Sequence, residues 1–390
     1  MASMVGKNAL LFATLAGMAL VQPVACNVVE APSLPDELVG LALEPVPAMV
    51  EVELQAFRAA LASLDLALLD WQESLAAGDG SADKELARQA WIEAMGAWQR
   101  LEVLQVGPAA SSLWSVGGED LRDEIYSWPD TVSGCRVDTE TVEQAWNEAD
   151  FFTANFVNSY GLDAVEHLLF APLATECPAQ VDIQAGWDAL GESGVEANRA
   201  AYAIEVVRYA DETAADLERR WQESVASDFV SGAAPWNSRA ASLQSLFEAL
   251  YYLETRTKDR KLAEPLGLRT CTASCGTLVE SRLSGMSVAW IRVNLEVARE
   301  LVEAGEDNGL DELLVQVGYP DLAEALVAAI SVAEQEASSL EGPLDELIQS
   351  DPAAVTALLE SIRGITDLLR GDVATVLLLQ LPAEAAGDND

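Results

Sequence analysis

The chain has 390 residues, half of them hydrophobic, which is enough for one large domain or two helical units with a sizeable core. Its 22 Lys and Arg residues are outnumbered by 64 Asp and Glu residues, so the formal net charge is -42. Because so acidic a surface repels phosphate groups and anionic lipid headgroups, the composition argues against nucleic-acid binding. The acidic residues are spread along the chain, which is typical of a solvated surface.

The first 25 residues have the pattern of a secretion signal. Lys7 supplies the positive charge, and residues 9–21 form an apolar run that is too short to span a bilayer. The sequence Pro-Val-Ala-Cys26 follows, and a cysteine after a small residue is typical of bacterial lipoproteins acylated on that thiol. Pro23 departs from the branched aliphatic residue usual at its position. We therefore predict a signal peptide over 1–25 and lipidation of Cys26, with simple signal cleavage as the alternative.

Residues 26–47 are rich in Pro, Glu and Val, and we predict a tether between the anchor and the folded part. Apolar residues then recur at alternating steps of three and four between Leu54 and Leu75, which predicts a long helix. A second helix is predicted over about 82–106. Residues 107–138 are predicted to be an irregular loop, because glycine and proline interrupt every periodic pattern there.

Helical periodicity continues through the rest of the chain and no alternating strand pattern of any length occurs. Further helices are predicted over about 139–158, 184–190, 195–227, 238–257, 280–304, 320–340 and 352–370. The sequence therefore predicts an all-α fold over 48–380, followed by an acidic tail at 381–390.

A short internal repeat suggests two halves of similar plan. Trp71-Gln-Glu-Ser-Leu-Ala76 recurs as Trp221-Gln-Glu-Ser-Val-Ala226, and residues 97–102 line up with residues 249–254. We predict two helical bundles, over about 48–190 and 191–380. A chance match, or helix composition shared by the two segments, is the alternative.

Besides the predicted lipidation site, the chain contains Cys135, Cys177, Cys271 and Cys275. An even number of cysteines in an exported chain indicates disulfides, and four cysteines allow three pairings. Cys271 with Cys275 would close a short loop, and Cys135 with Cys177 would join the chain on both sides of the segment described next. A site of four thiolates around a metal is the alternative, disfavoured because no CxxC pair is present.

The segment 160–172, YGLDAVEHLLFAP, contains the only histidine of the chain, His167. Asp163, Glu166 and His167 have i, i+3, i+4 spacing, so they share one face of a predicted helix. Carboxylate oxygens are suitable ligands for hard cations, which include ferric iron. A short amphipathic helix with one solvated face is the plainer interpretation of the same spacing.

Two further glutamates are candidate ligands. Glu102 lies at the end of the second predicted helix, and Glu254 is its counterpart in the internal repeat. Each could equally be a solvated surface residue, and His167 could be an ordinary hydrogen-bonded or exposed histidine. A hydrolytic zinc site usually needs about three protein ligands that include imidazoles, so a chain with one histidine and no HExxH motif is a poor metallopeptidase candidate.

Taken together, several segments resemble the imelysin-like family of bacterial periplasmic or lipid-anchored proteins. They are AWQRLEVLQVGP (97–108), IYSWPD (125–130), GLDAVEHLLF (161–170), DRKLAEPLG (259–267), CTASCGTLVESRLSGMS (271–287) and the closing DVATVLLLQLP. The resemblance implies an all-α fold of two helical bundles, export and a link to iron acquisition. In the family motif GxHxxE, Gly161 and Glu166 match but Asp163 stands in place of the histidine. The chain therefore resembles the branch that lacks this histidine, and His167 lies one residue past the glutamate.

We expect an exported lipoprotein of the periplasm or cell envelope that binds iron or another divalent or trivalent cation. The expected site is lined by carboxylates and lies between two helical bundles. The expected partners are the membrane, through the lipid anchor, and iron-transport components. A metallopeptidase, as the family name suggests, and a structural or interaction protein of the envelope are the alternatives.

Overall fold

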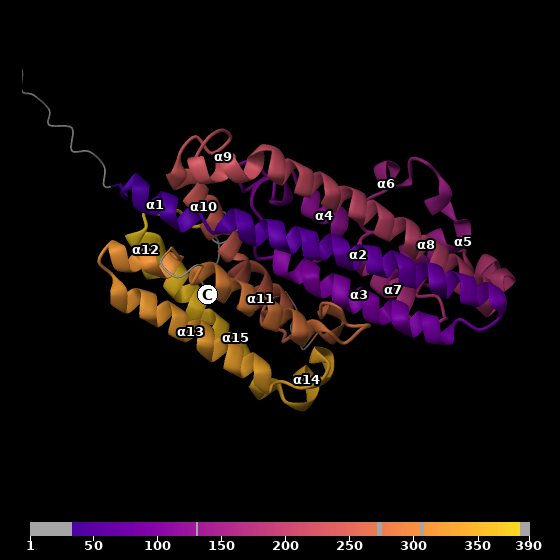
Figure 1. The fold of residues 1–390 in the computed structure, drawn as a ribbon. Coiled ribbons are helices and arrows are strands. Elements are labelled where there is room, and N and C mark those ends of the chain that lie inside the picture. The colour runs from indigo at the N-terminus through magenta and orange to yellow at the C-terminus, as the bar shows by residue number, and fades with distance from the viewer. Residues whose placement is uncertain (1–32, 130–131, 271–274, 305–307, 383–390) are drawn as a thin grey trace, which may run out of the picture. The chain divides into compact units, whose positions relative to one another are not determined.

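The computed structural model describes residues 33–129, 132–270, 275–304 and 308–382. The predicted signal peptide, Cys26, Cys271 and most of the predicted acidic tail lie outside these ranges. Within them the chain forms α-, 3-10 and π-helices and no strand, which confirms the predicted all-α fold (Figure 1). Among these residues, no helix combines the length and the apolar character that a membrane span requires.

The N-terminal part of the fold is built on three long helices, α2 (Val46–Ala77), α3 (Ser81–Leu101) and α8 (Gln184–Arg220). Figure 1 shows α2 lying along both α3 and α8, and these pairs make the most extensive helix contacts of the chain. The apolar stripe predicted on α2 is buried in this arrangement, and its fully buried members are Leu54, Phe57, Leu61, Leu64, Leu68 and Trp71. The helix ends where Gly78 adopts a left-handed conformation, with φ 109°.

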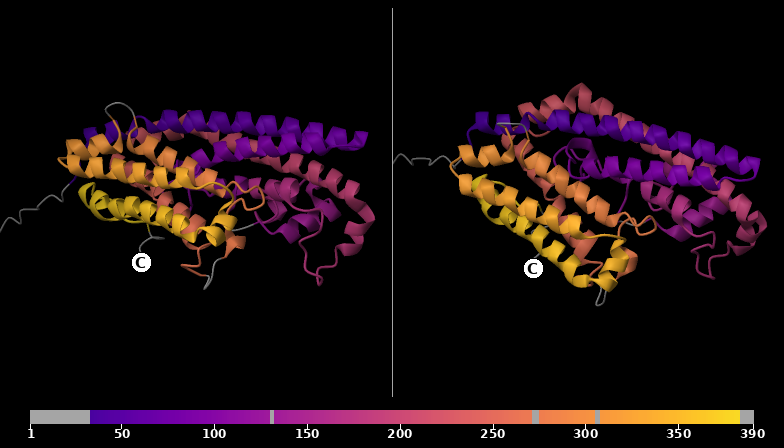
Figure 2. Two further views of the ribbon diagram at one scale, coloured as in Figure 1. Left: turned by 90° about the horizontal axis from the view of Figure 1, so that it is seen from below. Right: turned by 60° about the horizontal axis from the view of Figure 1, so that its bottom comes forward.

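The C-terminal helices form a layer of their own beside α2 and α3 (Figures 1 and 2). Here α13 (Pro320–Ser339) packs against α11 (Ser287–Val302), α12 (Leu310–Gln316) and α15 (Pro352–Leu368). Because α11 also contacts α3, the two groups of helices share one continuous hydrophobic core.

Shorter helices connect and cover the long ones. The α-helices are α1 (Asp36–Leu43), α4 (Leu121–Ile125), α5 (Gly134–Glu143), α6 (Phe151–Ala154), α7 (Leu162–Phe170), α9 (Ala226–Ser231), α10 (Arg239–Leu250), α14 (Leu344–Ser350) and α16 (Ala374–Val376). The 3-10 turns are η1 (Gly107–Ala109), η2 (Ala145–Asn147) and η5 (Gly276–Leu278), and the π-helical segments are η3 (Trp221–Val225), η4 (Leu253–Ala263) and η6 (Leu369–Val373).

The predicted tether ends well before residue 47, so that prediction is wrong for its second half. Helix α1 packs against α10 and buries Val39 and Leu43 almost completely. The high content of Pro and Glu concealed a short apolar face that needs only two turns of helix.

The single helix predicted over 139–158 is also wrong. The chain forms α5, turns at Gln144, and continues through η2 and α6. Gln144 adopts φ 57° and ψ 32°, a left-handed conformation that cannot continue a right-handed helix.

The predicted boundary at residue 190 falls inside α8. Gly191 interrupts the helix there, with φ 61° and ψ 176°, but α8 resumes and packs along α2 and against α7. The contacts therefore group α8 with α2 and α3, although most of its sequence belongs to the predicted second half.

Candidate functional site

Helix α7, which carries the predicted site, is held rigidly by its surroundings. It packs against α3, α5 and α8, and Leu162, Val165 and Leu169 are fully buried. The Trp91 indole N–H donates a 2.8 Å hydrogen bond to the Leu162 carbonyl oxygen. At the start of the helix, Gly161 has φ 103°, and a Cβ there would lie 2.7 Å from Asp163 Oδ1 and 3.1 Å from a backbone oxygen. The glycine is therefore needed both for its conformation and for space.

A cavity of about 240 Å³ lies beside α7, and we refer to it as the α7 cavity. Its lining residues are Tyr126, Trp128, Val132, Gly134, Asp163, Glu166, His167, Glu176, Thr277, Leu278, Val279, Ser281, Arg282 and Leu283. The structure thus brings the three predicted α7 residues together in the lining of one cavity, which the segment at 277–283 also lines.

Asp163 is half-buried, and few groups stabilise its negative charge. The Ser127 hydroxyl donates to Oδ2 at 3.0 Å, and the Ala164 backbone N–H donates to Oδ1 at 3.1 Å. Burial raises the pKa of Asp163 to about 7, although these hydrogen bonds and the positive charge of Arg122 act in the opposite direction.

Glu166, one turn further along α7, is buried and also has few groups that stabilise its negative charge. The Ser284 backbone N–H donates to its Oε1 at 2.8 Å. Burial raises the pKa of Glu166 to about 7; hydrogen bonds from Ser284 and the charge of Arg282 lower it, while the charge of Glu280 raises it. Near neutral pH the two carboxyls can therefore change charge together with the occupancy of the cavity, because a bound cation favours their ionised forms.

His167 is held by a buried aspartate that the sequence analysis did not identify. Its Nε2 lies 3.0 Å from Asp138 Oδ1, and the Glu176 backbone N–H donates to Asp138 Oδ2 at 2.7 Å. Burial acts to raise the pKa of Asp138, but the contacts with His167, Glu176 and Arg199 hold it below its usual value. The histidine is thus fixed by hydrogen bonding, as the plainer interpretation of the sequence allowed.

A disulfide supports this wall of the α7 cavity. Cys135 and Cys177 are bonded to each other, which is one of the pairings considered from the sequence. The bridge joins α5, which carries Asp138, to the loop segment that carries Glu176. Cys275 is also disulfide-bonded, and Cys271, its partner in that pairing scheme, lies outside the described residues.

The other two predicted ligands lie elsewhere. Glu102 is fully buried and forms two 3.0 Å hydrogen bonds with the Arg122 guanidinium. Glu254 is also buried, and its Oε1 accepts a 2.8 Å hydrogen bond from Lys258. Neither lines the α7 cavity, so the structure does not bring either of them to Asp163 and Glu166.

The sequence patterns also did not identify a buried ionic cluster next to the α7 cavity. Glu280 Oε1 accepts hydrogen bonds from the Tyr126 hydroxyl at 2.9 Å and the Gln99 amide at 3.0 Å, and its Oε2 lies 2.9 Å from Lys261 Nζ. Sequence signals for it existed, because Tyr126, Lys261 and Glu280 all belong to the segments that carry the family resemblance. Asp138 had no such signal.

The comparisons with known proteins agree with this fold. The profile of the imelysin family, classed as peptidase M75, matches residues 53–370. The chain belongs to the imelysin family. An imelysin-like protein from Psychrobacter arcticum has a similar structure, with a TM-score of 0.68 and 17% identity over 90% of this chain and 98% of that one.

A second similar structure is that of a putative iron-regulated protein A precursor from Parabacteroides distasonis. It has a TM-score of 0.67 and 14% identity, over 89% of this chain and 97% of that one. A search of curated proteins gave no significant match. At these identities the structural likeness establishes the fold of the imelysin-family chain, and its site must be judged on its own residues.

The side chains of the α7 cavity do not form a ready metal site. Among the residues that the structure describes, no three His, Cys, Asp or Glu side chains gather closely enough to hold a metal ion. Asp163 and Glu166 each use one oxygen to accept a backbone hydrogen bond, and His167 uses Nε2 with Asp138. Within its described residues, this imelysin-family chain therefore has no preformed set of the ligands that a hydrolytic zinc centre requires.

Proposed function

We propose that this imelysin-family protein is a binding component of the bacterial cell envelope that takes part in the acquisition of iron or another metal. The cation is its cargo, and it is held in the α7 cavity together with its own water ligands. The observation that supports this most strongly is that two carboxyls, the half-buried Asp163 and the buried Glu166, face one cavity with pKa values raised to about 7.

The geometry favours contact through water over direct ligation. Among the residues that the structure describes, three direct ligands do not converge, but a cavity of about 240 Å³ has room for several water molecules. Hydrated cations such as Mg²⁺ keep most of their waters and are commonly held through one or two carboxylates. Water bound to a cation donates strong hydrogen bonds to carboxylate oxygens, which Asp163 and Glu166 can supply.

The proposed role in metal acquisition is based on a protein of similar structure. The Parabacteroides protein of similar fold is described as a putative iron-regulated protein, and we extend a role in iron or metal uptake to this chain. The signal peptide, the lipid anchor on Cys26, the periplasmic or envelope location and the iron-transport partners belong to the same proposal. Incorporation of labelled palmitate into the wild type, and none into Cys26→Ser, would test the anchor.

Calorimetry with three probes tests the binding role. They are Mn²⁺, Fe²⁺ under anaerobic conditions, and cobalt(III) hexaammine, whose ligands do not exchange and which therefore binds only through its outer sphere. We expect all three to bind, and we expect the variant Asp163→Asn/Glu166→Gln to weaken each by about tenfold or more. Salt near 0.15 M limits binding to the acidic surface, since charges there are screened over about 8 Å.

A matched control separates the cavity from the general negative charge. Asp321→Asn/Glu324→Gln removes the same two residue types at the same spacing from an exposed face of α13. Equal loss in both variants would mean that the cations bind the acidic surface, and the proposed site would fall. If Fe²⁺ binds and cobalt(III) hexaammine does not, the water-mediated arrangement is wrong.

A further inference from the structure

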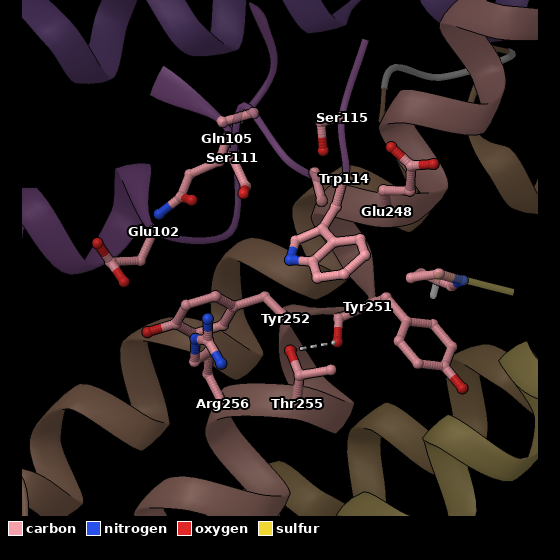
Figure 3. A pocket seen from close by; sticks show the side chains of 13 residues that line it. Glu102, Gln105, Ser111, Trp114, Ser115, Glu248, Tyr251, Tyr252, Thr255 and Arg256 are labelled. Carbon is pink, nitrogen blue, oxygen red and sulfur yellow. Dashed lines mark hydrogen bonds between the residues drawn. The ribbon is translucent and has the colours of Figure 1, made fainter. Parts of the chain in front are cut away.

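A second cavity, of about 100 Å³, lies between the loop after α3 and the junction of α10 with η4 (Figure 3). Its wall includes Gln105 and Trp114 from the loop, Glu248 from α10, and Tyr252 and Arg256 from the junction. Apart from Glu102 at its edge, no sequence motif had pointed to these residues as a site.

Four polar atoms of the residues that line this cavity are buried and make no close hydrogen bond. Among the described residues, Gln105 Nε2, Glu248 Oε2 and the Tyr251 and Tyr252 hydroxyls make no close hydrogen bond, and the Tyr251 hydroxyl points away from Trp114 (Figure 3). Tyr252 as a whole is only 7% exposed. A buried polar group without a partner costs about 1–3 kcal/mol, so native structures rarely leave several together unless something else occupies the space.

The other three unpaired atoms are divided by chemical type. Figure 3 shows the Gln105 amide and the Tyr252 hydroxyl on one side of the Trp114 indole, beside the Glu102 carboxylate that Arg122 neutralises, and the Glu248 carboxylate on the other. The first side offers hydrogen-bond donors to an anionic group. The second side offers an acceptor to a cationic group, next to an aromatic ring that also favours a cation.

Glu248 has no basic partner among the described residues, and Gln244 donates to its Oε1 at 3.1 Å. Burial raises the pKa of the Glu248 carboxyl more than its polar neighbours Gln244 and Ser115 lower it. A positively charged group beside Oε2 would therefore stabilise the ionised carboxylate.

We propose that the second cavity binds a small zwitterionic α-amino acid. Its carboxylate accepts hydrogen bonds from Gln105 Nε2 and the Tyr252 hydroxyl. Its ammonium group donates to Glu248 Oε2 and lies against Trp114. A volume of about 100 Å³ limits the ligand to a small side chain.

Isosteric probes test the need for both charges. L-Alanine is compared with propionate, which lacks the ammonium group, with ethylamine, which lacks the carboxylate, and with glycerol, a neutral polyol. By ligand-observed NMR and calorimetry we expect L-alanine to bind with a dissociation constant near 1 mM or below, and the other probes at least about tenfold more weakly. No binding of L-alanine at about 10 mM, or equal binding of glycerol, would overturn the proposal.

Substitutions then assign the contacts. Glu248→Gln should weaken L-alanine by about tenfold and bring its affinity close to that of propionate, because only the ammonium contact is lost. Gln105→Leu and Tyr252→Phe should each weaken L-alanine severalfold without affecting ethylamine. Asp321→Asn/Glu324→Gln is again the control and should leave binding unchanged. If Glu248→Gln folds normally and binds L-alanine as the wild type does, the assignment is wrong.

A truncation after Pro382 tests a competing occupant. Pro382 lines the second cavity, and the eight residues that follow it in the sequence lie outside the described ranges. We expect L-alanine to bind the truncated chain with unchanged affinity. A gain of about tenfold would identify the C-terminal segment as the natural occupant and would overturn the proposal of a free amino acid.

Discussion

Glu280 and Glu166 are both buried acidic side chains close to the α7 cavity, but they differ in what surrounds them. Glu280 is fully buried and contacts Tyr126, Gln99 and Lys261. Glu166 is 7% exposed and accepts a hydrogen bond from one backbone N–H, that of Ser284. The comparison separates a carboxylate that completes the core from one that leaves bonding capacity for a ligand, and burial alone would not have told them apart.

The largest effect on stability should come from removing the cation that pairs with Glu280. Lys261→Met would leave Glu280 as a buried charge without a cation, and we expect a loss of about 3–5 kcal/mol in the free energy of unfolding. Urea denaturation at neutral pH measures it. Arg208→Met breaks an exposed ion pair with Asp65 and should cost less than about 1 kcal/mol. Similar losses in both variants would show that Lys261 is not essential to the core.

Replacing the two carboxyls that have few stabilising partners should instead increase the stability of the fold. Asp163→Asn/Glu166→Gln removes two carboxyls whose folded-state pKa values are raised to about 7, well above their unfolded values. The wild type therefore loses stability as pH rises from about 4 to 7, since ionisation is then disfavoured only in the folded state. We expect the variant to be more stable at pH 8 by on the order of 2 kcal/mol, with the gain shrinking toward pH 5.

Urea denaturation at both pH values checks this, against Asp321→Asn/Glu324→Gln. That control removes the same charge from the surface, so it corrects for the general repulsion within a chain of net charge -42. A gain that is equal at the two pH values, or equal in the control, would contradict the raised pKa values.

The smallest effect on stability should come from removing one hydrogen-bond donor to Asp163. Ser127→Ala removes the hydroxyl that donates to Asp163, which should cost about 1 kcal/mol at pH 8, where Asp163 is ionised. At pH 5.5 the cost should be smaller, because the protonated carboxyl needs the donor less. Thermal unfolding at the two pH values measures the difference. Ser227→Ala, on the surface of α9, should change stability little at either pH.

The long helices could be predicted because their signal is local. The apolar stripe on α2 repeats with the helical period, and its residues from Leu54 to Trp71 are buried on the same face. The broken region after α5 could not be predicted in this way. Its turn depends on Gln144 adopting a left-handed conformation, which nothing in the neighbouring sequence requires.

For the candidate site too, only the arrangement that depends on local spacing could be predicted. Asp163, Glu166 and His167 are neighbours on one helix, so their spacing was enough to place them together. The position of Glu102 depends on Arg122, which is 20 residues away, and that of His167 Nε2 depends on Asp138, which is 29 residues away. Such contacts are set by tertiary packing, and one sequence does not record them.

Gly134 shows how finely the wall of the α7 cavity is fitted. A Cβ at this position would lie 2.1 Å from Glu176 Oε2 and 2.8 Å from His167 Cε1. Because residue 134 begins α5, alanine would suit the local backbone better than glycine does. One added methyl group would therefore displace a carboxylate and an imidazole while leaving every charge and the helix intact, which makes Gly134→Ala a change in shape alone.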